Sequence, residues 1–307
     1  MADSAKTRQS VECLAIPFGV VLLLFAFLGP SYADSASDAV AEASALTRAG
    51  KTKQAETVLR SAAAANPDSA AVHGALGRLL FNRQNYADSV EELNLAEQLA
   101  PDSREYNMLL AAALLGSKRY GVALNFLHIV QPRFEQYPEF HYSLGLAYYN
   151  LAQFTKAEEA FEEALRLDPK MDRAQFLLAN CIASEGDFSK AADILRRLIG
   201  THPKNVIYWT TLGDVLRQAG PENRPEALRA CHRALALKPG DPHTQFVLAT
   251  ILLDAGDFAG ARQLLERLEK LSPNELEAHV ALARVYARMG HPELARQEKE
   301  IVDKLQK

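Results

Sequence analysis

The sequence has no excess of positive charge. Its 307 residues contain 34 Lys and Arg against 38 Asp and Glu, which gives a formal net charge of −4. Proteins that bind DNA or RNA normally present a basic surface, because Lys and Arg supply most of their phosphate contacts. The mildly acidic composition therefore excludes nucleic acid as the expected partner.

Motifs for catalysis and for metal binding are also lacking. No Gly-rich phosphate loop and no nucleophile motif occurs in the sequence. Eight histidines are present, but no two combine helical spacing with a third ligand of the kind that zinc needs. His73, His141 and His279 stand at one position of the repeated unit described below, where we expect a large, flat side chain for packing. We therefore expect no enzyme, and no catalytic, cofactor or metal site.

Cysteine is scarce, with three residues in the whole chain. Cys181 and Cys231 both fall at core positions of predicted helices that are not immediate neighbours in a hairpin stack. A disulfide requires the two Cα atoms to lie within about 7 Å. We expect two buried thiols that pack as small hydrophobic residues, although an oxidising compartment would permit a disulfide.

Long apolar runs are lacking except for one, Leu14–Leu28, near the N-terminus. Two basic residues precede this run and small residues follow it up to Ala33, which is the pattern of a secretory signal peptide cleaved after Ala33. The run is shorter than the roughly 20 residues that a membrane span needs. We expect residues 1–33 to be a signal peptide, and residues 34–307 to be exported, periplasmic or secreted, with no membrane span after cleavage. An uncleaved N-terminal anchor is the alternative.

Prolines recur through the rest of the chain at a nearly constant interval. Successive members of the series are separated by 34, 68, 34, 36 and 34 residues: Pro67, Pro101, Pro169, Pro203, Pro239 and Pro273. A fixed period of this size indicates a repeated supersecondary unit that buries its apolar face only by stacking on its neighbours.

The unit that begins at Pro138 shows the pattern within one period. The residues at positions 4, 7, 8 and 11 share one face of a predicted helix, and those at positions 20, 24 and 27 share a face of a second helix. Small residues at positions 8 and 20 let the two helices approach closely. The residues at these positions and at position 17 are His141, Leu144, Gly145, Tyr148, Phe154, Ala157, Phe161 and Ala164.

This spacing resembles the tetratricopeptide repeat (TPR), a 34-residue helix hairpin. Matching pairs recur at Leu76-Gly77, Leu178-Ala179, Leu212-Gly213 and Leu248-Ala249, and Trp209 is the tryptophan of the repeat pattern. The resemblance implies an all-α fold, a right-handed α-α superhelical solenoid of about eight helix hairpins over residues 34–307. The expected units begin near residues 36, 70, 104, 138, 172, 206, 242 and 276.

Three units depart from the pattern. The third has Glu135 where the proline is expected, with Pro132 nearby, so we expect its second helix to end early, near Val130. The sixth contains a two-residue insertion within 220–225, expected to form a longer, exposed turn. The eighth has Lys299 at an apolar position and a polar second helix, as the open end of an array requires.

The resemblance also implies a partner-binding groove. First helices line the inner face of a tetratricopeptide array, with positions 2, 5, 9 and 12 pointing into it. A contiguous apolar strip with aromatic anchors is typical of a binding site. The expected groove residues are Phe81, Met108, Leu115, Tyr142, Leu146, Tyr149, Phe176, Asn180, Asp214, Arg217, Phe246 and Leu253.

Two alternatives bear on this groove. Tyr142, Tyr149 and Phe176 could simply pack against adjoining first helices and bind nothing, although tyrosine hydroxyls in a dry contact would need partners. The family's Lys and Asn clamp for a C-terminal carboxylate is not matched, because position 5 never holds lysine and Asn180 stands alone at position 9. The expected groove has an apolar half and a polar half, which favours an amphipathic helix or an extended peptide as ligand.

Two main functions remain open. The first is a non-enzymatic protein–protein interaction scaffold of the cell envelope, which the resemblance implies. The second is a polysaccharide-binding or export adaptor whose groove aromatics stack on sugar rings. An accessory subunit of a separately encoded enzyme is a further alternative.

Overall fold

The computed structural model describes residues 32–306, and side chains from residue 35 onward. Nearly all of the expected signal peptide, residues 1–31, lies outside the described residues. Within the described range every regular element is a helix and there is no strand, so the all-α fold is confirmed. None of these helices is long and apolar enough to cross a membrane.

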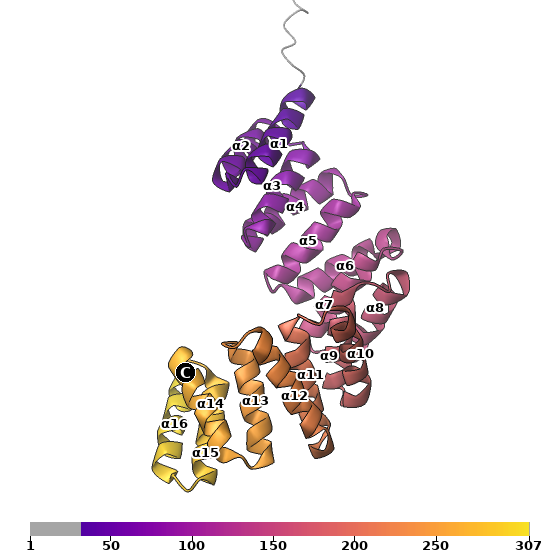
Figure 1. Ribbon diagram of the computed structural model, residues 1–307. Helices are drawn as coiled ribbons and strands as arrows, with labels where there is room; N and C mark the ends of the chain where they lie inside the picture. The colour runs from indigo at the N-terminus through magenta and orange to yellow at the C-terminus, as the bar shows by residue number, and fades with distance from the viewer. Residues whose placement is uncertain (1–31, 307) are drawn as a thin grey trace, which may run out of the picture. The chain divides into compact units, whose positions relative to one another are not determined.

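The helices form eight consecutive hairpins (Figure 1). The first helices are α1 (Tyr32–Arg48), α3 (Ala70–Asn82), α5 (Arg104–Gly116), α7 (Pro138–Asn150), α9 (Asp172–Ser184), α11 (Val206–Ala219), α13 (Pro242–Ala255) and α15 (Leu276–Arg288). The second helices are α2 (Thr52–Ala65), α4 (Tyr86–Leu99), α6 (Tyr120–Phe134), α8 (Phe154–Leu167), α10 (Phe188–Thr201), α12 (Arg224–Leu237), α14 (Phe258–Leu271) and α16 (Pro292–Leu305).

The chain divides into two compact units, each with its own core. Unit 1 ends at Ala100 and holds α1–α4, and unit 2 begins at Pro101 and holds α5–α16. The core of unit 1 centres on Leu59, Leu76 and Leu80. In unit 2, the most extensive core cluster runs from α8 to α13 and includes Phe161 and Leu195. The candidate site described below lies wholly within unit 2.

Close approach of the two helices in a hairpin depends on a small residue at position 8. A Cβ atom added to Gly145 would lie 2.6–2.9 Å from the ring of Phe161, which is fully buried. Gly77 against Leu93 and Gly213 against Cys231 show the same close approach, with added-Cβ distances of 2.5 and 2.6 Å. The hairpin spacing expected from the sequence is thus set by direct contact at this position.

A polar contact recurs at position 4 of every unit from the second to the eighth. A side-chain nitrogen there donates a hydrogen bond to the backbone carbonyl six residues earlier, just after the preceding second helix ends. The seven pairs are His73–Pro67 (3.0 Å), Asn107–Pro101 (2.9 Å), His141–Glu135 (2.6 Å), Gln175–Pro169 (2.7 Å), Trp209–Pro203 (2.9 Å), Gln245–Pro239 (3.2 Å) and His279–Pro273 (2.9 Å). The three histidines at this position, expected from the sequence only to pack, therefore have a polar role as well.

The expected early end of the third unit's second helix is wrong. Helix α6 continues to Phe134, with Pro132 inside it. Proline removes one backbone donor and its ring crowds the carbonyl four residues earlier, but only two residues of α6 follow it. Phe134 is buried at 3% exposure and Val130 at 0%, so packing of the last turn retains the helical conformation.

The insertion in the sixth unit forms a short element rather than an irregular turn. Gly220, with φ of 131°, ends α11, and a 3-10 helix, η1 (Pro221–Asn223), follows it. Pro225 lies in the first turn of α12, where a missing backbone N–H costs little. Pro221, Glu222 and Pro225 are exposed, as expected.

The last helix, α16, is largely exposed. Lys299 faces solvent, and only Glu298 and Val302 of this helix are buried. Burial of a carboxylate in a terminal helix is unusual, because charged groups are rarely buried without a partner.

Candidate functional site

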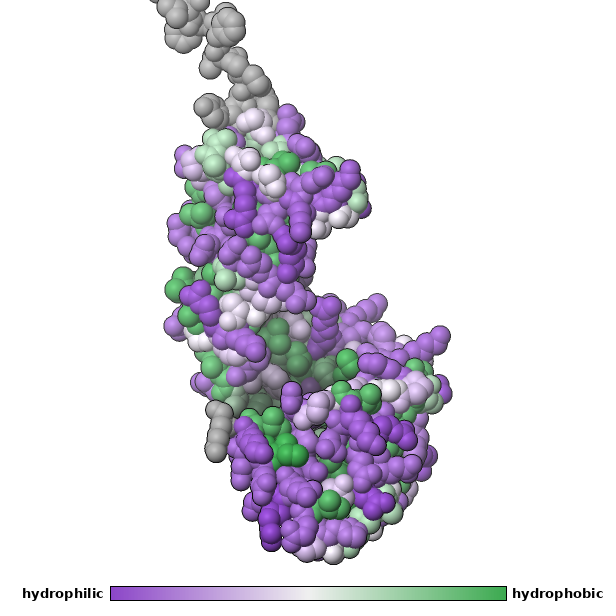
Figure 2. Space-filling model, turned by 90° about the vertical axis from the view of Figure 1, so that its left-hand side faces the viewer, coloured by the Kyte–Doolittle hydropathy of each residue, from purple (hydrophilic) through white to green (hydrophobic). Residues whose placement is uncertain are grey.

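First helices line the face on which the candidate site lies. Within unit 2, α5 contacts α7, α11 contacts α13, and α13 contacts α15, so these three pairs of first helices lie side by side. Among the described residues, no two neighbouring second helices are in contact as extensive as that of these three pairs. First helices therefore crowd on the inner side of the stack. Figure 2 shows hydrophobic residues gathered in a hollow on one face of the molecule, among hydrophilic surroundings.

Most of the expected groove residues of unit 2 are half-buried. Phe81 is half-buried too, but it belongs to unit 1. Leu253 departs from the expectation: it is only 7% exposed and packs into the core formed by α13, α14 and α15, because α15 lies against α13. The half-buried members of unit 2 are Met108, Leu115, Tyr142, Leu146, Tyr149, Phe176, Asn180, Asp214, Arg217 and Phe246.

The aromatic members of the groove rest on the core beneath them. The ring centroids of Tyr142 and Phe161 lie 6.0 Å apart, and those of Phe176 and Tyr208 lie 5.3 Å apart. Tyr149 meets Phe154 edge-on at 5.7 Å. These aromatic side chains therefore contribute packing energy whether or not a ligand is bound.

The tyrosine hydroxyls nevertheless remain available. Among the described residues, neither the Tyr142 nor the Tyr149 hydroxyl makes a hydrogen bond with the protein, and neither is among the buried polar atoms that lack a partner. Burial of the rings raises the pKa of both hydroxyls, so both stay protonated donors at neutral pH. This arrangement favours a hydrated groove over a dry contact.

A pocket of about 390 Å³ lies in this groove and brings four of the expected residues together. Tyr149, Phe176, Asn180 and Asp214 line it, from α7, α9 and α11. We call this the groove pocket; its other lining residues are Ala183, Ser184, Ile207, Thr211, Val215, Gln218 and His243. Ile207 is 60% exposed, so its side chain is accessible to a ligand in the groove pocket.

The polar groups of the groove pocket differ in how they are satisfied. Within the described residues, the Asn180 side-chain amide makes no hydrogen bond, so its donor and acceptor are both free to bind a ligand. Asp214 instead accepts hydrogen bonds from Arg217, at 3.0 and 3.1 Å, and from Gln218 at 2.9 Å. Arg217 also donates to Asp254 at 3.1 Å.

This network holds Arg217 in place. Burial alone would lower the pKa of the Arg217 guanidinium, but the neighbouring Asp214 and Asp254 carboxylates outweigh that effect and raise it. Arg217 and its two aspartates thus neutralise much of one another's charge. The groove pocket therefore offers apolar walls, one free amide and a fixed polar rim, which suits a peptide backbone with an apolar side chain.

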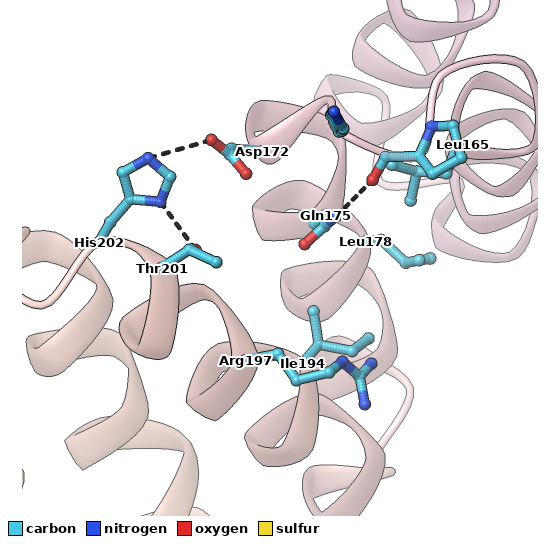
Figure 3. Close-up of a pocket in the computed structure, with 10 residues that line it drawn as sticks. Leu165, Asp172, Gln175, Leu178, Ile194, Arg197, Thr201 and His202 are labelled. Carbon is cyan, nitrogen blue, oxygen red and sulfur yellow. Dashed lines mark hydrogen bonds and ion pairs between the residues drawn. The ribbon is translucent and has the colours of Figure 1, made fainter.

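A second pocket, of about 670 Å³, was not expected from the sequence (Figure 3). Leu165, Leu178 and Ile194 form its apolar part, between α8, α9 and α10. At its rim, His202 Nε2 lies 3.3 Å from Asp172 Oδ2, and both side chains are exposed. This pocket lies where two hairpins meet and shares no lining residue with the groove pocket.

Both thiols of the described residues, Cys181 and Cys231, are free and buried. Burial raises the pKa of each to about 12. Neither is a nucleophile at neutral pH, because the thiolate is the reactive form.

Sequence profiles of the tetratricopeptide repeat match most of the chain. One profile matches residues 142–206 and 185–242, and a second matches 46–113, 221–275 and 252–299. The chain belongs to the tetratricopeptide repeat family. Members of this family are typically non-enzymatic and mediate protein–protein interactions.

Several known proteins are similar to this TPR protein. It is 26% identical over 231 residues to the peroxisomal targeting signal receptor of Kluyveromyces lactis, covering 73% of this chain and 40% of the receptor. It is 32% identical over 141 residues to the cellulose synthase 2 operon protein C of Komagataeibacter xylinus, covering 45% of this chain and 10% of that protein. The chain thus spans less than half of these relatives.

A solved TPR protein from Parabacteroides merdae has a similar fold. The TM-score is 0.66 at 18% identity, and the match covers 82% of this chain and 99% of the other. The fold of yeast Tom70 is also similar, with a TM-score of 0.57 at 17% identity, covering 83% of this chain and 55% of Tom70.

Sequence reasoning missed part of the groove pocket of this TPR protein. Ile207 and His243 stand at position 2 of their units, a position already expected to face the groove, so this signal was present in the sequence. Ser184 and Gln218 stand at position 13, one residue beyond the expected set. Position 12 lines the groove pocket at Tyr149 and Ala183, and position 13 lines it at Ser184 and Gln218, a difference between units that the repeat pattern does not encode.

Proposed function

We propose that this TPR protein is a non-enzymatic scaffold of the cell envelope that binds an extended or helical peptide segment in the groove of unit 2. The observation that carries the proposal is the groove pocket, where exposed Ile207 and the unbonded Asn180 amide lie beside Tyr149 and Phe176. An apolar side chain of the ligand would contact Ile207 and Phe176. The Asn180 amide would pair with the ligand backbone, as in other peptide grooves.

Similarity to a targeting-signal receptor supports a peptide ligand. The Kluyveromyces lactis relative is named as a receptor for a peroxisomal targeting signal, and the match covers 73% of this chain. The proposed partner of the present chain is a protein or peptide, and the segment need not resemble that signal.

The location in the cell envelope is supported by the N-terminal sequence. The run Leu14–Leu28, with basic residues before it and Ala33 after it, supports export. The mass of the protein recovered from the envelope tests this: a chain beginning at Asp34 supports cleavage, and a chain that retains Leu14–Leu28 supports an anchor.

Site-specific photo-crosslinking tests the groove. A photoreactive residue at position 207, introduced in the native host, should yield a crosslinked partner, because the Ile207 side chain lies in the groove pocket. Position 129 on α6 is the matched control, because Ile129 is also an exposed isoleucine, at 74%, and does not line the groove pocket. The partner captured at 207 should be lost on Asn180→Ala.

The outcome that rejects the groove is equally clear. Identical products at positions 207 and 129, or a position 207 product that Asn180→Ala leaves unchanged, would show that the groove pocket does not select the partner. Asn180→Ala is preferred to aromatic substitutions because Tyr142 and Phe176 also pack on the core.

A polysaccharide ligand is the second candidate. The 32% identity to the Komagataeibacter xylinus cellulose synthase 2 operon protein C supports it. So do the unbonded Tyr142 and Tyr149 hydroxyls, which could bind sugar hydroxyls while the rings stack. Retention on a cellulose gel that Tyr149→Ala abolishes would favour this candidate, and no retention would exclude cellulose.

A further inference from the structure

A buried histidine and two glutamates meet at the C-terminal end of unit 2. His279 Nδ1 lies 2.6 Å from Glu298 Oε2, and the side chains are 2% and 9% exposed. Glu269, half-buried on α14, completes the group, and the three candidate ligand atoms all lie within 4.8 Å of one another. We call these three residues the α14–α16 triad, since each comes from a different helix.

The second ring nitrogen of His279 is already committed. Nε2 lies 2.9 Å from the Pro273 carbonyl oxygen, which can only accept, so Nε2 carries a hydrogen. In the neutral ring, Nδ1 therefore presents a lone pair toward the Glu298 carboxylate. A lone pair and a carboxylate repel each other unless a proton or another cation lies between them.

The charge of the triad is not balanced by other side chains. Within the described residues, Glu269 makes no hydrogen bond and no ion pair, and Glu298 pairs only with His279. The nearby Tyr286 hydroxyl donates to Glu266, and Arg262 lies beside Glu266 at 3.5 Å. Two carboxylates thus share one imidazole in a partly buried place, where uncompensated charge is costly.

From this geometry we propose that the α14–α16 triad binds a divalent cation of the zinc class through His279 Nδ1 and the carboxylates of Glu269 and Glu298. Imidazole nitrogen and carboxylate oxygen are both zinc ligands, and water supplies the fourth ligand in sites with three protein ligands. The Nε2–H bond to the Pro273 carbonyl is the outer contact that orients a ligating imidazole and selects its tautomer.

A second histidine–glutamate pair in the chain provides an internal comparison. His73 Nδ1 lies 2.7 Å from Glu92, and His73 Nε2 lies 3.0 Å from the Pro67 carbonyl, at the same repeat positions. The two pairs differ at the position ten residues before the histidine. This position holds Glu269 in the case of His279, but Ala63 in the case of His73. Among the described residues only the α14–α16 triad has three grouped ligands, so Glu269 distinguishes a metal site from a hydrogen-bonded pair.

The proposed ion would join three helices at the end of the array. Glu269 lies near the end of α14, His279 on α15 and Glu298 on α16. Helix α16 buries few side chains, so a shared ion would tie it to the preceding hairpins. Glu269 and His279 are 10 residues apart, and His279 and Glu298 are 19 residues apart. A search of the sequence for metal ligands spaced along a single helix therefore does not find this site.

Zinc titration of the protein, purified from its native host and cleared of metal with a chelator, tests the proposal. Calorimetry should show one zinc per chain, and Glu269→Gln or His279→Gln should weaken binding by about tenfold or more, as expected when a metal contact is lost. A glutamine at 279 keeps a donor for the Pro273 carbonyl, as Gln175 and Gln245 do in their units, so this variant should fold. Glu92→Gln is the matched control and should bind zinc like the wild type.

Thermal unfolding gives an independent measurement. Zinc should raise the unfolding midpoint of the wild type and of Glu92→Gln but not of Glu269→Gln. The reason is that a ligand that binds only the folded state stabilises the folded state. Magnesium, which prefers oxygen ligands only, should have little effect. No stoichiometric zinc in the wild type, or equal zinc binding by Glu269→Gln, would overturn the proposal and leave His279 and Glu298 as a hydrogen-bonded pair like His73 and Glu92.

Discussion

At the scale of single residues, position 4 shows what one side chain must do in this repeat. The carbonyl just after each second helix has no helical partner, and a side-chain N–H six residues later satisfies it in seven units. Histidine, asparagine, glutamine and tryptophan differ in shape but all carry an N–H group. The shared requirement is therefore a donor of suitable reach rather than a flat ring.

Substitution of His141 separates these two requirements. His141→Phe keeps a flat ring but removes the donor to the Glu135 carbonyl at 2.6 Å, and should lower the free energy of unfolding by about 1 kcal/mol. His141→Gln keeps a donor, as Gln175 does in the next unit, and should lose less. Urea unfolding measures both; a phenylalanine variant as stable as wild type would show that ring shape alone matters.

Gly145 represents the other residue-scale requirement, the close contact at position 8. Gly145→Ala places a Cβ within 2.6–2.9 Å of the Phe161 ring, which is buried and cannot withdraw, and should destabilise the protein by about 1–3 kcal/mol. Gly121→Ala on α6 is the control, because nothing lies within 4 Å of its added Cβ. That variant should be neutral or slightly stabilising in the same urea titration, since alanine favours helix; an unchanged Gly145→Ala would contradict the close contact.

At the scale of helices, ion pairs link second helices of successive hairpins. Lys190 on α10 reaches Glu158 on α8 at 2.8 Å, and Arg196 on α10 forms two hydrogen bonds of 2.9 Å with Glu226 on α12. Second helices of successive hairpins are not among the helix pairs in extensive contact within the described residues. Long charged side chains span the distance between them and help to set the pairing of neighbours.

The Arg196–Glu226 pair predicts a pH dependence. Hydrogen bonds from Arg196 lower the pKa of Glu226 below its unfolded value near 4.5. A lowered folded-state pKa means that the stabilisation is fully present above about pH 4.5 and is lost as pH falls through the folded-state value. Both side chains are more than a third exposed, at 41% and 34%, so solvent screening limits the contribution to under about 1 kcal/mol.

Urea unfolding of Glu226→Gln from pH 7 to pH 3 measures this contribution. At pH 7 the wild type should be more stable than Glu226→Gln, and this difference in the free energy of unfolding should shrink toward pH 3. Glu300→Gln is the control, because Glu300 is exposed and has no ion pair among the described residues. A difference between wild type and Glu226→Gln that stays constant with pH would exclude the ion pair as its cause.

At the scale of the whole molecule, the chain contains two separately packed units. Unit 1 has its core around Leu59, Leu76 and Leu80, and unit 2 has three core clusters of its own. Stability in repeat proteins is approximately a sum over repeats and nearest-neighbour interfaces. Since the groove pocket and the α14–α16 triad both lie in unit 2, that unit should retain both functions.

Expression of residues 101–307 alone tests this independence. The fragment should be helical by far-UV circular dichroism, unfold cooperatively in urea, and form the same crosslink at position 207 as the full chain. Asn180→Ala in the same fragment is the control and should abolish the crosslink, because Asn180 lines the groove pocket. An unfolded fragment 101–307, or loss of the crosslink in it, would show that unit 1 is required.

The sequence by itself determined the repeat and its boundaries, because these depend on local signals. Prolines at a regular interval, small residues at position 8 and the helical period lie within one unit, and α3, α5, α7, α9, α11, α13 and α15 begin at residues 70, 104, 138, 172, 206, 242 and 276. The error at Pro132 arose from the same local reasoning, because burial of Phe134 by neighbouring helices overrides the preference of proline.

Only the tertiary structure decided which side chains meet. The rotation of one hairpin against the next opens Ser184 and Gln218 into the groove pocket, buries Leu253, and brings Glu269, His279 and Glu298 together from three helices. That rotation results from side-chain packing between residues far apart in sequence, so no local pattern encodes it. The physical reason is that a repeat specifies its own helices locally, whereas its binding surface is formed jointly with its neighbours.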